Sequence, residues 1–104
     1  MKHKEARVKR DRLAANLPDG AEILRGSLLE RIIRHKQGCT RCARGEGHPV
    51  LVLNVNYPGG KNRQISLHPE QKDQVERWLE NYQRLKNRLE EICELNHVLL
   101  RPEP

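Results

Sequence analysis

The sequence predicts an α+β fold in which a small antiparallel β-sheet carries a Cys/His-rich knot and one long amphipathic helix follows. Three observations support this prediction. Residues 50–57 and 63–67 resemble the two strands of a hairpin, and residues 35–48 combine two cysteines, two histidines and three glycines. Residues 69–101 repeat apolar side chains every three or four positions. At 104 residues with 36% hydrophobic content, such a domain needs added stabilisation from a metal or a partner.

The N-terminal part offers two ambiguous segments. Residues 1–20 form a basic arm that ends at the turn signal Pro18-Asp19-Gly20, and a frayed helix or a mobile arm fits equally well. In residues 23–34, Ser27 and Glu30 make a capping-box pattern that favours a short helix from Leu28. The alternation of apolar and polar residues instead favours a third strand over about residues 29–35.

The hairpin and the long helix are the clearest elements. Alternating aliphatic and asparagine residues predict the strand 50–57, and Pro58-Gly59-Gly60-Lys61 predicts the turn before the strand 63–67. Pro69 suits the first turn of a helix. We therefore expect a basic arm at 1–20, a knot with a hairpin at 21–68 and a helix at 69–101, with 21–101 as one domain.

The knot has the spacing His35-x3-Cys39-x2-Cys42-x5-His48, which is typical of a zinc-knuckle-like site. Thiolates two residues apart share one tight turn, and imidazole completes a tetrahedral set around Zn²⁺. We expect zinc bound by His35, Cys39, Cys42 and His48. Three alternatives remain open: a set in which Cys93 and His97 join the cysteine pair, a redox role for that pair, and no metal.

The predicted helix is longer than the hairpin that covers it, because about 30 helical residues span roughly 45 Å and eight strand residues only roughly 26 Å. Its distal part therefore needs another partner. Either the N-terminal segment folds back onto it, or a second copy or another protein binds there. The predicted interface follows an a/d heptad row: Trp78, Tyr82, Leu85, Leu89, Ile92, Asn96 and Leu99.

Charge is divided along the chain. Residues 1–66 carry 14 basic and 6 acidic side chains, whereas residues 67–104 carry 6 basic and 8 acidic ones. A basic part followed by a mixed-charge helix predicts one surface for DNA or RNA and another for protein. The predicted phosphate contacts flank the knot and the hairpin tip: Arg34, Lys36, Arg41, Arg44, Lys61 and Arg63.

The sequence disfavours membrane proteins, secreted proteins and enzymes. No apolar run has membrane-spanning length and no secretory signal is present, so we expect a cytoplasmic protein without a membrane partner. We expect no enzymatic activity, because Glu46 is the only acid in the knot and four protein ligands leave zinc without an open position. The carboxylates of the predicted helix have basic neighbours at helical spacing, as on a solvated face.

The chain also resembles a known family. The shared features are Gly26-Ser27-Leu28, the knot ending in Cys42-Ala43-Arg44-Gly45-Glu46-Gly47-His48, the Gly59-Gly60-Lys61 turn, and the helix containing Val75 to Tyr82. The family consists of small uncharacterised bacterial and archaeal proteins that are often encoded near transposases and other mobile elements. The family usually has cysteine at the position of His35. The resemblance covers about residues 23–100 and implies a role in mobile-element biology, without a known reaction.

Two functional hypotheses follow. The first is a zinc-stabilised protein that contacts the backbone of DNA or RNA as an accessory factor of a mobile-element or related nucleic-acid-processing system. The alternative is an adaptor whose long helix docks a larger enzyme or associates with itself.

Overall fold

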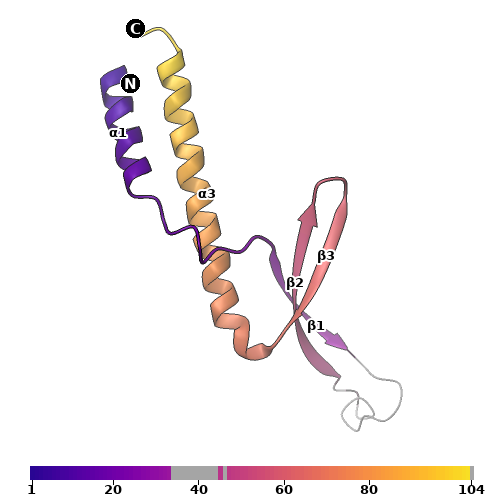
Figure 1. Ribbon diagram of the computed structural model, residues 1–104. Coiled ribbons are helices and arrows are strands. Elements are labelled where there is room, and N and C mark those ends of the chain that lie inside the picture. The colour runs from indigo at the N-terminus through magenta and orange to yellow at the C-terminus, as the bar shows by residue number, and fades with distance from the viewer. Residues whose placement is uncertain (34–44, 46, 104) are drawn as a thin grey trace. The chain divides into compact units, whose positions relative to one another are not determined.

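The computed structural model describes residues 1–33, 45 and 47–103 (Figure 1). The elements are α1 (His3–Ala15), β1 (Ser27–Ile33), β2 (His48–Tyr57), β3 (Lys61–Leu67), the 3-10 turn η1 (Pro69–Gln71) and α3 (Lys72–Leu100). A three-stranded antiparallel sheet with a long C-terminal helix confirms the predicted α+β class. Most of the knot lies outside the described residues, so its zinc-knuckle-like structure stays a prediction.

The strand order in the sheet is β1-β2-β3, with β2 in the centre. Ser27 pairs with Asn54 and Ile33 with His48, so the third strand begins at Ser27 and the helix that the capping-box pattern favoured is not formed. Strand pairing prevails there because Leu28 packs against the apolar cluster of Leu53 and Val55, which a strand at this register makes possible.

The β2–β3 turn lies where the sequence predicts it. Tyr57 pairs with Lys61, and the three residues between them form the loop. Gly59 and Gly60 have φ angles of 84° and 77°, in the left-handed region that glycine adopts without steric cost. This loop ends the hairpin at the far end from η1.

The chain divides into two compact units, one formed by residues 24–79 and the other by residues 1–23 and 80–104. In the unit of residues 24–79, the first turns of α3 pack on one face of the sheet around Leu53, Val55 and Val75. The backbone N–H of Leu24 donates to the carbonyl of Trp78 at 3.1 Å, which joins the segment before β1 to the helix. The helix entry is capped, because the His68 N–H donates to Oε1 of Gln71 at 2.9 Å.

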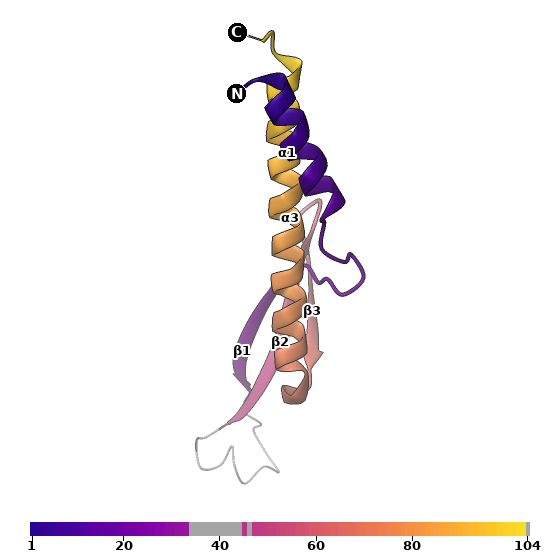
Figure 2. The same cartoon turned by 90° about the vertical axis from the view of Figure 1, so that its left-hand side faces the viewer.

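In the other unit, α1 lies alongside the distal part of α3 (Figures 1 and 2). Ala6 and Leu13 of α1 pack against Leu95, and all three side chains are buried. The N-terminal segment thus forms a helix that covers part of the distal stripe within the same chain. This is the intramolecular partner that the sequence left as one alternative.

Candidate nucleic-acid interface

The candidate site lies at the turn end of the β2–β3 hairpin, where the pairing register places basic side chains together. Lys61 lies opposite Tyr57, and Arg63 lies opposite Val55. Directly paired residues of an antiparallel sheet project from the same face. Since Val55 is buried beside Val75 of α3, the face carrying Lys61 and Arg63 is the one on which α3 packs.

A third cation joins them from the segment before β1. The guanidinium carbon of Arg25 lies 5.3 Å from the centroid of the Tyr57 ring, within the range of a cation–π contact. The same guanidinium donates to the backbone carbonyl of Asn56. Both contacts hold Arg25 at the hairpin end, next to the strand pair that carries Lys61. We call Arg25, Lys61 and Arg63 the tip cluster.

Within the described residues, the tip cluster has no acidic partner in an ion pair. No Asp or Glu occurs between Glu46 and Glu70, so β2, the turn and β3 contain cations alone. Among the residues that the structure describes, no carboxylate forms an ion pair with Arg25, Lys61 or Arg63. All three side chains are exposed. Exposed cations of one sign at the end of a hairpin form a local positive potential that attracts a polyanion.

The sequence predicted part of this cluster. Lys61 and Arg63 were predicted, and the structure brings them together; Arg34, Lys36, Arg41 and Arg44 lie outside the described residues. Arg25 was missed because it precedes the sheet by two residues, and only the β1–β2 register brings it beside Tyr57. The aromatic residue before a Gly-rich turn was the available signal, since exposed rings attract guanidinium groups.

The metal prediction concerns mainly residues that the structure leaves undescribed. His35, Cys39 and Cys42 lie outside the described residues, and His48 is described only as the first backbone position of β2, paired with Ile33. Within the described ranges, no three His, Cys, Asp or Glu side chains gather as a metal site. Cys93, the residue of one alternative set, is a free and exposed cysteine on α3. The zinc site stays a prediction.

The predicted partner-helix residues have several environments. Trp78, Tyr82 and Leu85 are half-buried, and Leu89 is 47% exposed. Ile92 and Leu99 pack against the cluster of Ala6, Leu13 and Leu95. Oδ1 of Asn96 accepts a hydrogen bond of 3.2 Å from Arg10 of α1. The C-terminal half of the row is therefore engaged within the chain, whereas Leu89 remains exposed.

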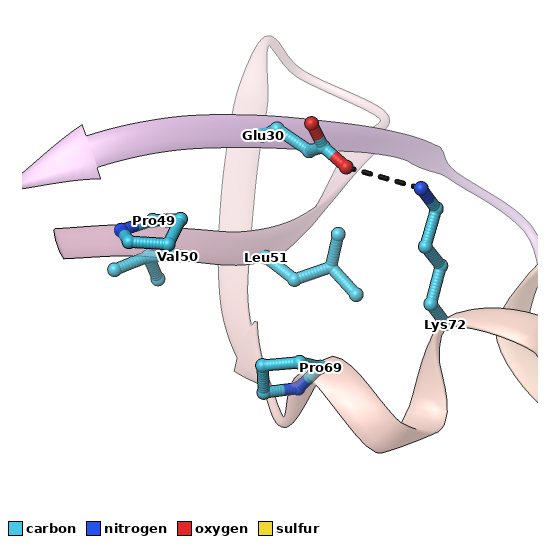
Figure 3. Close-up of a pocket in the computed structure, with 6 residues that line it drawn as sticks. All are labelled: Glu30, Pro49, Val50, Leu51, Pro69 and Lys72. Atoms are coloured by element: carbon cyan, nitrogen blue, oxygen red, sulfur yellow. Dashed lines mark hydrogen bonds and ion pairs between the residues drawn. The ribbon is translucent and has the colours of Figure 1, made fainter.

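A small apolar hollow lies at the other end of the sheet (Figure 3). Its volume is about 170 Å³, and it is lined by Glu30, Pro49, Val50, Leu51, Pro69 and Lys72. Lys72 Nζ lies 3.2 Å from Oε1 of Glu30, and this hydrogen bond, with the charge of Glu30, raises the pKa of Lys72 above its ordinary value. The ion pair closes one side of the hollow and ties β1 to the first turn of α3.

No family model matches the chain, and no curated protein and no solved structure matches it. In the part of the chain that the structure describes, no helix is long and apolar enough to cross a membrane. A functional assignment therefore depends on the geometry and charge of the site itself.

Proposed function

We propose that this chain is a zinc-stabilised nucleic-acid-binding protein that contacts the phosphate backbone of DNA or RNA. The main support for the proposal is the tip cluster, in which three exposed cations share one end of the hairpin and form no ion pair with a carboxylate of the described residues. Lys and Arg side chains that neutralise phosphates release condensed counterions, and this release supplies most of the sequence-independent affinity.

The basic N-terminal helix supports the same proposal. The buried face of α1 carries Ala6 and Leu13, and the exposed face carries Lys4, Lys9 and Arg12. Arg10 alone is drawn inwards, to Asn96. A helix that buries Ala6 and Leu13 and exposes lysine and arginine offers a second set of phosphate contacts.

The proposed setting is an accessory factor of a mobile-element or related nucleic-acid-processing system. This part rests on the resemblance of the Cys/His knot, the Gly59-Gly60-Lys61 turn and the helix from Val75 to Tyr82 to a family encoded near transposases. A non-catalytic accessory factor needs a nucleic-acid surface and a protein surface, and the tip cluster and the exposed part of α3 would supply them.

Salt-dependent binding tests the proposal. Fluorescence anisotropy with a labelled duplex should show affinity that falls steeply with salt, and the double variant Lys61→Ala/Arg63→Ala should lower the log–log slope by about 2. The matched control is Lys86→Ala/Arg88→Ala, which removes the same charge from exposed positions of α3. An equal decrease in affinity and salt slope in the two variants would show that the tip cluster is not the binding site. The absence of wild-type binding near physiological salt would show the same.

A second candidate function, an adaptor that binds a protein through α3, is favoured by one observation. Leu89 is a large apolar side chain in the predicted heptad row, and it is 47% exposed. Lone exposed leucines are common, so the discriminating measurement is association. Light scattering of the wild type and of Leu89→Glu should show a concentration-dependent dimer that the substitution abolishes; a wild-type monomer at all concentrations would remove self-association from consideration.

A further inference from the structure

The second face of the β2–β3 hairpin carries four carboxamide side chains. Since Leu53 and Val55 point towards α3, the alternate residues of β2 project from the opposite face. Asn54 pairs with Gln64, and Asn56 pairs with Asn62, so both strands contribute to this face. We call Asn54, Asn56, Asn62 and Gln64 the amide face.

These side chains have no structural task within the described part of the chain. No hydrogen bond in that part involves any of their carboxamide groups, although Asn56 accepts through its backbone carbonyl. Asn54 is half-buried and the other three are exposed. Asparagine is disfavoured in strands, where β-branched and aromatic residues pack better. Three asparagines within two paired strands therefore favour a role in recognition.

The end of the sheet is a two-stranded ribbon with the Arg25 side chain against its β2 edge. Strand β1 begins opposite Asn54, so beyond that position only β2 and β3 continue, through the pairs Val55–Arg63, Asn56–Asn62 and Tyr57–Lys61. Paired strands lie about 4.8 Å apart. The major groove of B-DNA, about 12 Å wide, admits such a ribbon.

The spacing along the ribbon matches stacked base pairs. Successive positions on one face of a strand are about 6.8 Å apart, which corresponds to two steps of about 3.4 Å along the duplex. Carboxamides pair bidentately with the N6 and N7 positions of adenine in the major groove. The two amide rungs, Asn54 with Gln64 and Asn56 with Asn62, would thus meet base pairs two steps apart.

The other face of the ribbon supplies the phosphate contacts. The major groove is about 8.5 Å deep, so a ribbon with its amides at the base edges carries its opposite face near the groove rim. Lys61 and Arg63 project from that opposite face. Long, exposed cations at the rim reach the phosphates on either side, which fixes the register of the ribbon in the groove.

We propose that the β2–β3 hairpin inserts into the major groove of double-stranded DNA, where the amide face reads adenine and the tip cluster holds the flanking phosphates. This inference rests on the proposed nucleic-acid-binding function and adds the class of nucleic acid and the mode of readout. Duplex RNA does not fit, because its major groove is deep and too narrow for side chains to read. Single strands are disfavoured, because binding them relies on several aromatic side chains on which successive bases stack, and Tyr57 is the only Phe, Trp or Tyr residue of the hairpin.

The test compares three labelled duplexes of equal length: DNA with an A·T-rich centre, DNA with a G·C-rich centre, and RNA. The wild type should prefer the A·T-rich DNA by about tenfold or more. Replacing the central adenines by 7-deazaadenine removes the N7 acceptor, which faces only the major groove, and should abolish the preference. A preference that survives this replacement, as minor-groove contact would produce, overturns the proposal.

The matched variant is Asn56→Thr/Asn62→Thr, which keeps residues that favour strands and removes both outer amides. Its preference for A·T-rich DNA should fall severalfold, because only the inner rung remains, while the affinity for G·C-rich DNA and its salt slope stay unchanged. The control Asn87→Ala removes an exposed amide from α3 and should keep the preference. Circular dichroism of each variant verifies that the sheet is retained.

The outcomes separate this inference from the proposed function. Equal wild-type binding to all three duplexes, with no effect of the Thr variant, overturns groove reading and leaves backbone binding intact. Tighter binding to RNA than to DNA likewise overturns it. Absence of binding to every duplex removes both proposals.

Discussion

At the scale of single residues, the backbone at Gly26 leaves no room for a side chain. Its φ is +148°, and a Cβ built there would lie 2.9 Å from the backbone oxygen of Asn54 and 2.9 Å from Cδ1 of Leu53. Both neighbours belong to the central strand and cannot retreat without disturbing the core. We expect Gly26→Ala to lower the free energy of unfolding by about 1–3 kcal/mol, as measured by urea denaturation followed by circular dichroism.

Gly20→Ala is the control for this substitution. A Cβ at Gly20 meets nothing within 4 Å, and its φ lies outside the left-handed region. The variant should therefore unfold at nearly the same urea concentration as the wild type, or slightly higher, because alanine restricts the unfolded chain. A similar decrease in the free energy of unfolding for both alanine variants would show that close packing at Gly26 does not cause the destabilisation.

The ion pair between Glu30 and Lys72 gives a prediction for alkaline pH. The hydrogen bond to Glu30 raises the pKa of Lys72 in the folded state, so the pair stabilises the fold below about pH 10.5 and this contribution disappears as the pH rises through the raised pKa. Because both side chains are exposed, the effect is small. Thermal melts of wild type and Glu30→Gln should differ slightly at neutral pH and converge in strong alkali.

Glu80→Gln is the matched control, because it breaks an exposed pair with Arg84, whose N–O distance is 3.3 Å. Arginine does not lose its proton in this range, so the difference from wild type should stay constant with pH. A Glu30→Gln difference that widens as the pH rises would contradict the assignment of the shift to Glu30.

At the scale of elements, the sequence predicted those whose pattern is local. The alternation of Val55 and Tyr57 with asparagines located β2, and the glycines located the turn. The long helix begins as η1 at the predicted Pro69 and continues to Leu100. The limits of β1 could not be predicted from its own residues, because Ser27 and Glu30 fit a helix cap as well as a strand. Only the pairing with β2 decides between the two.

The heptad pattern of α3 does not show which side chains of the distal helix are buried. The heptad row contains Leu89, which is 47% exposed, whereas Leu95 lies beside that row and is only 7% exposed. The buried face is set by where α1 docks, with Ala6 and Leu13 on Leu95. The same reason explains the missed Arg25, since a contact between residues far apart in sequence leaves no periodic signal.

Docking of α1 can be tested through Leu95. Leu95→Ala removes the central side chain of its cluster and should lower the free energy of unfolding by about 2 kcal/mol or more. We expect hydrogen exchange of the α1 amides to accelerate, while the β2 amides of the other unit stay protected.

Leu100→Ala, at a side chain that is 85% exposed, is the control and should change neither measurement. Unchanged α1 exchange in Leu95→Ala would mean that α1 is held by contacts other than this cluster.

At the scale of the whole molecule, the division of charge along the sequence differs from the division into units. The basic segment 1–66 is shared between the two, because α1 belongs with the distal helix and the tip cluster belongs with the sheet. Each unit therefore carries exposed cations of its own, on α1 in one and on the hairpin in the other. The sequence predicted the sign of the charge, but the units depend on packing that composition does not encode.

Zinc is the prediction that concerns the stability of the whole chain. The described core is lean, with eight buried apolar side chains, so a bound metal would supply much of the missing stabilisation. We expect the purified protein to contain one zinc per chain by elemental analysis. Cys39→Ser/Cys42→Ser should lose the metal and melt about 10 °C or more below the wild type, a change of roughly 2 kcal/mol.

The control is Cys93→Ser, at the exposed cysteine of α3, which should keep both the metal and the melting temperature. Loss of zinc from the Cys93→Ser variant would instead support the alternative ligand set with His97. A metal-free wild type whose melting is unaffected by the double substitution would contradict the zinc prediction and leave the nucleic-acid proposal to the tip cluster alone.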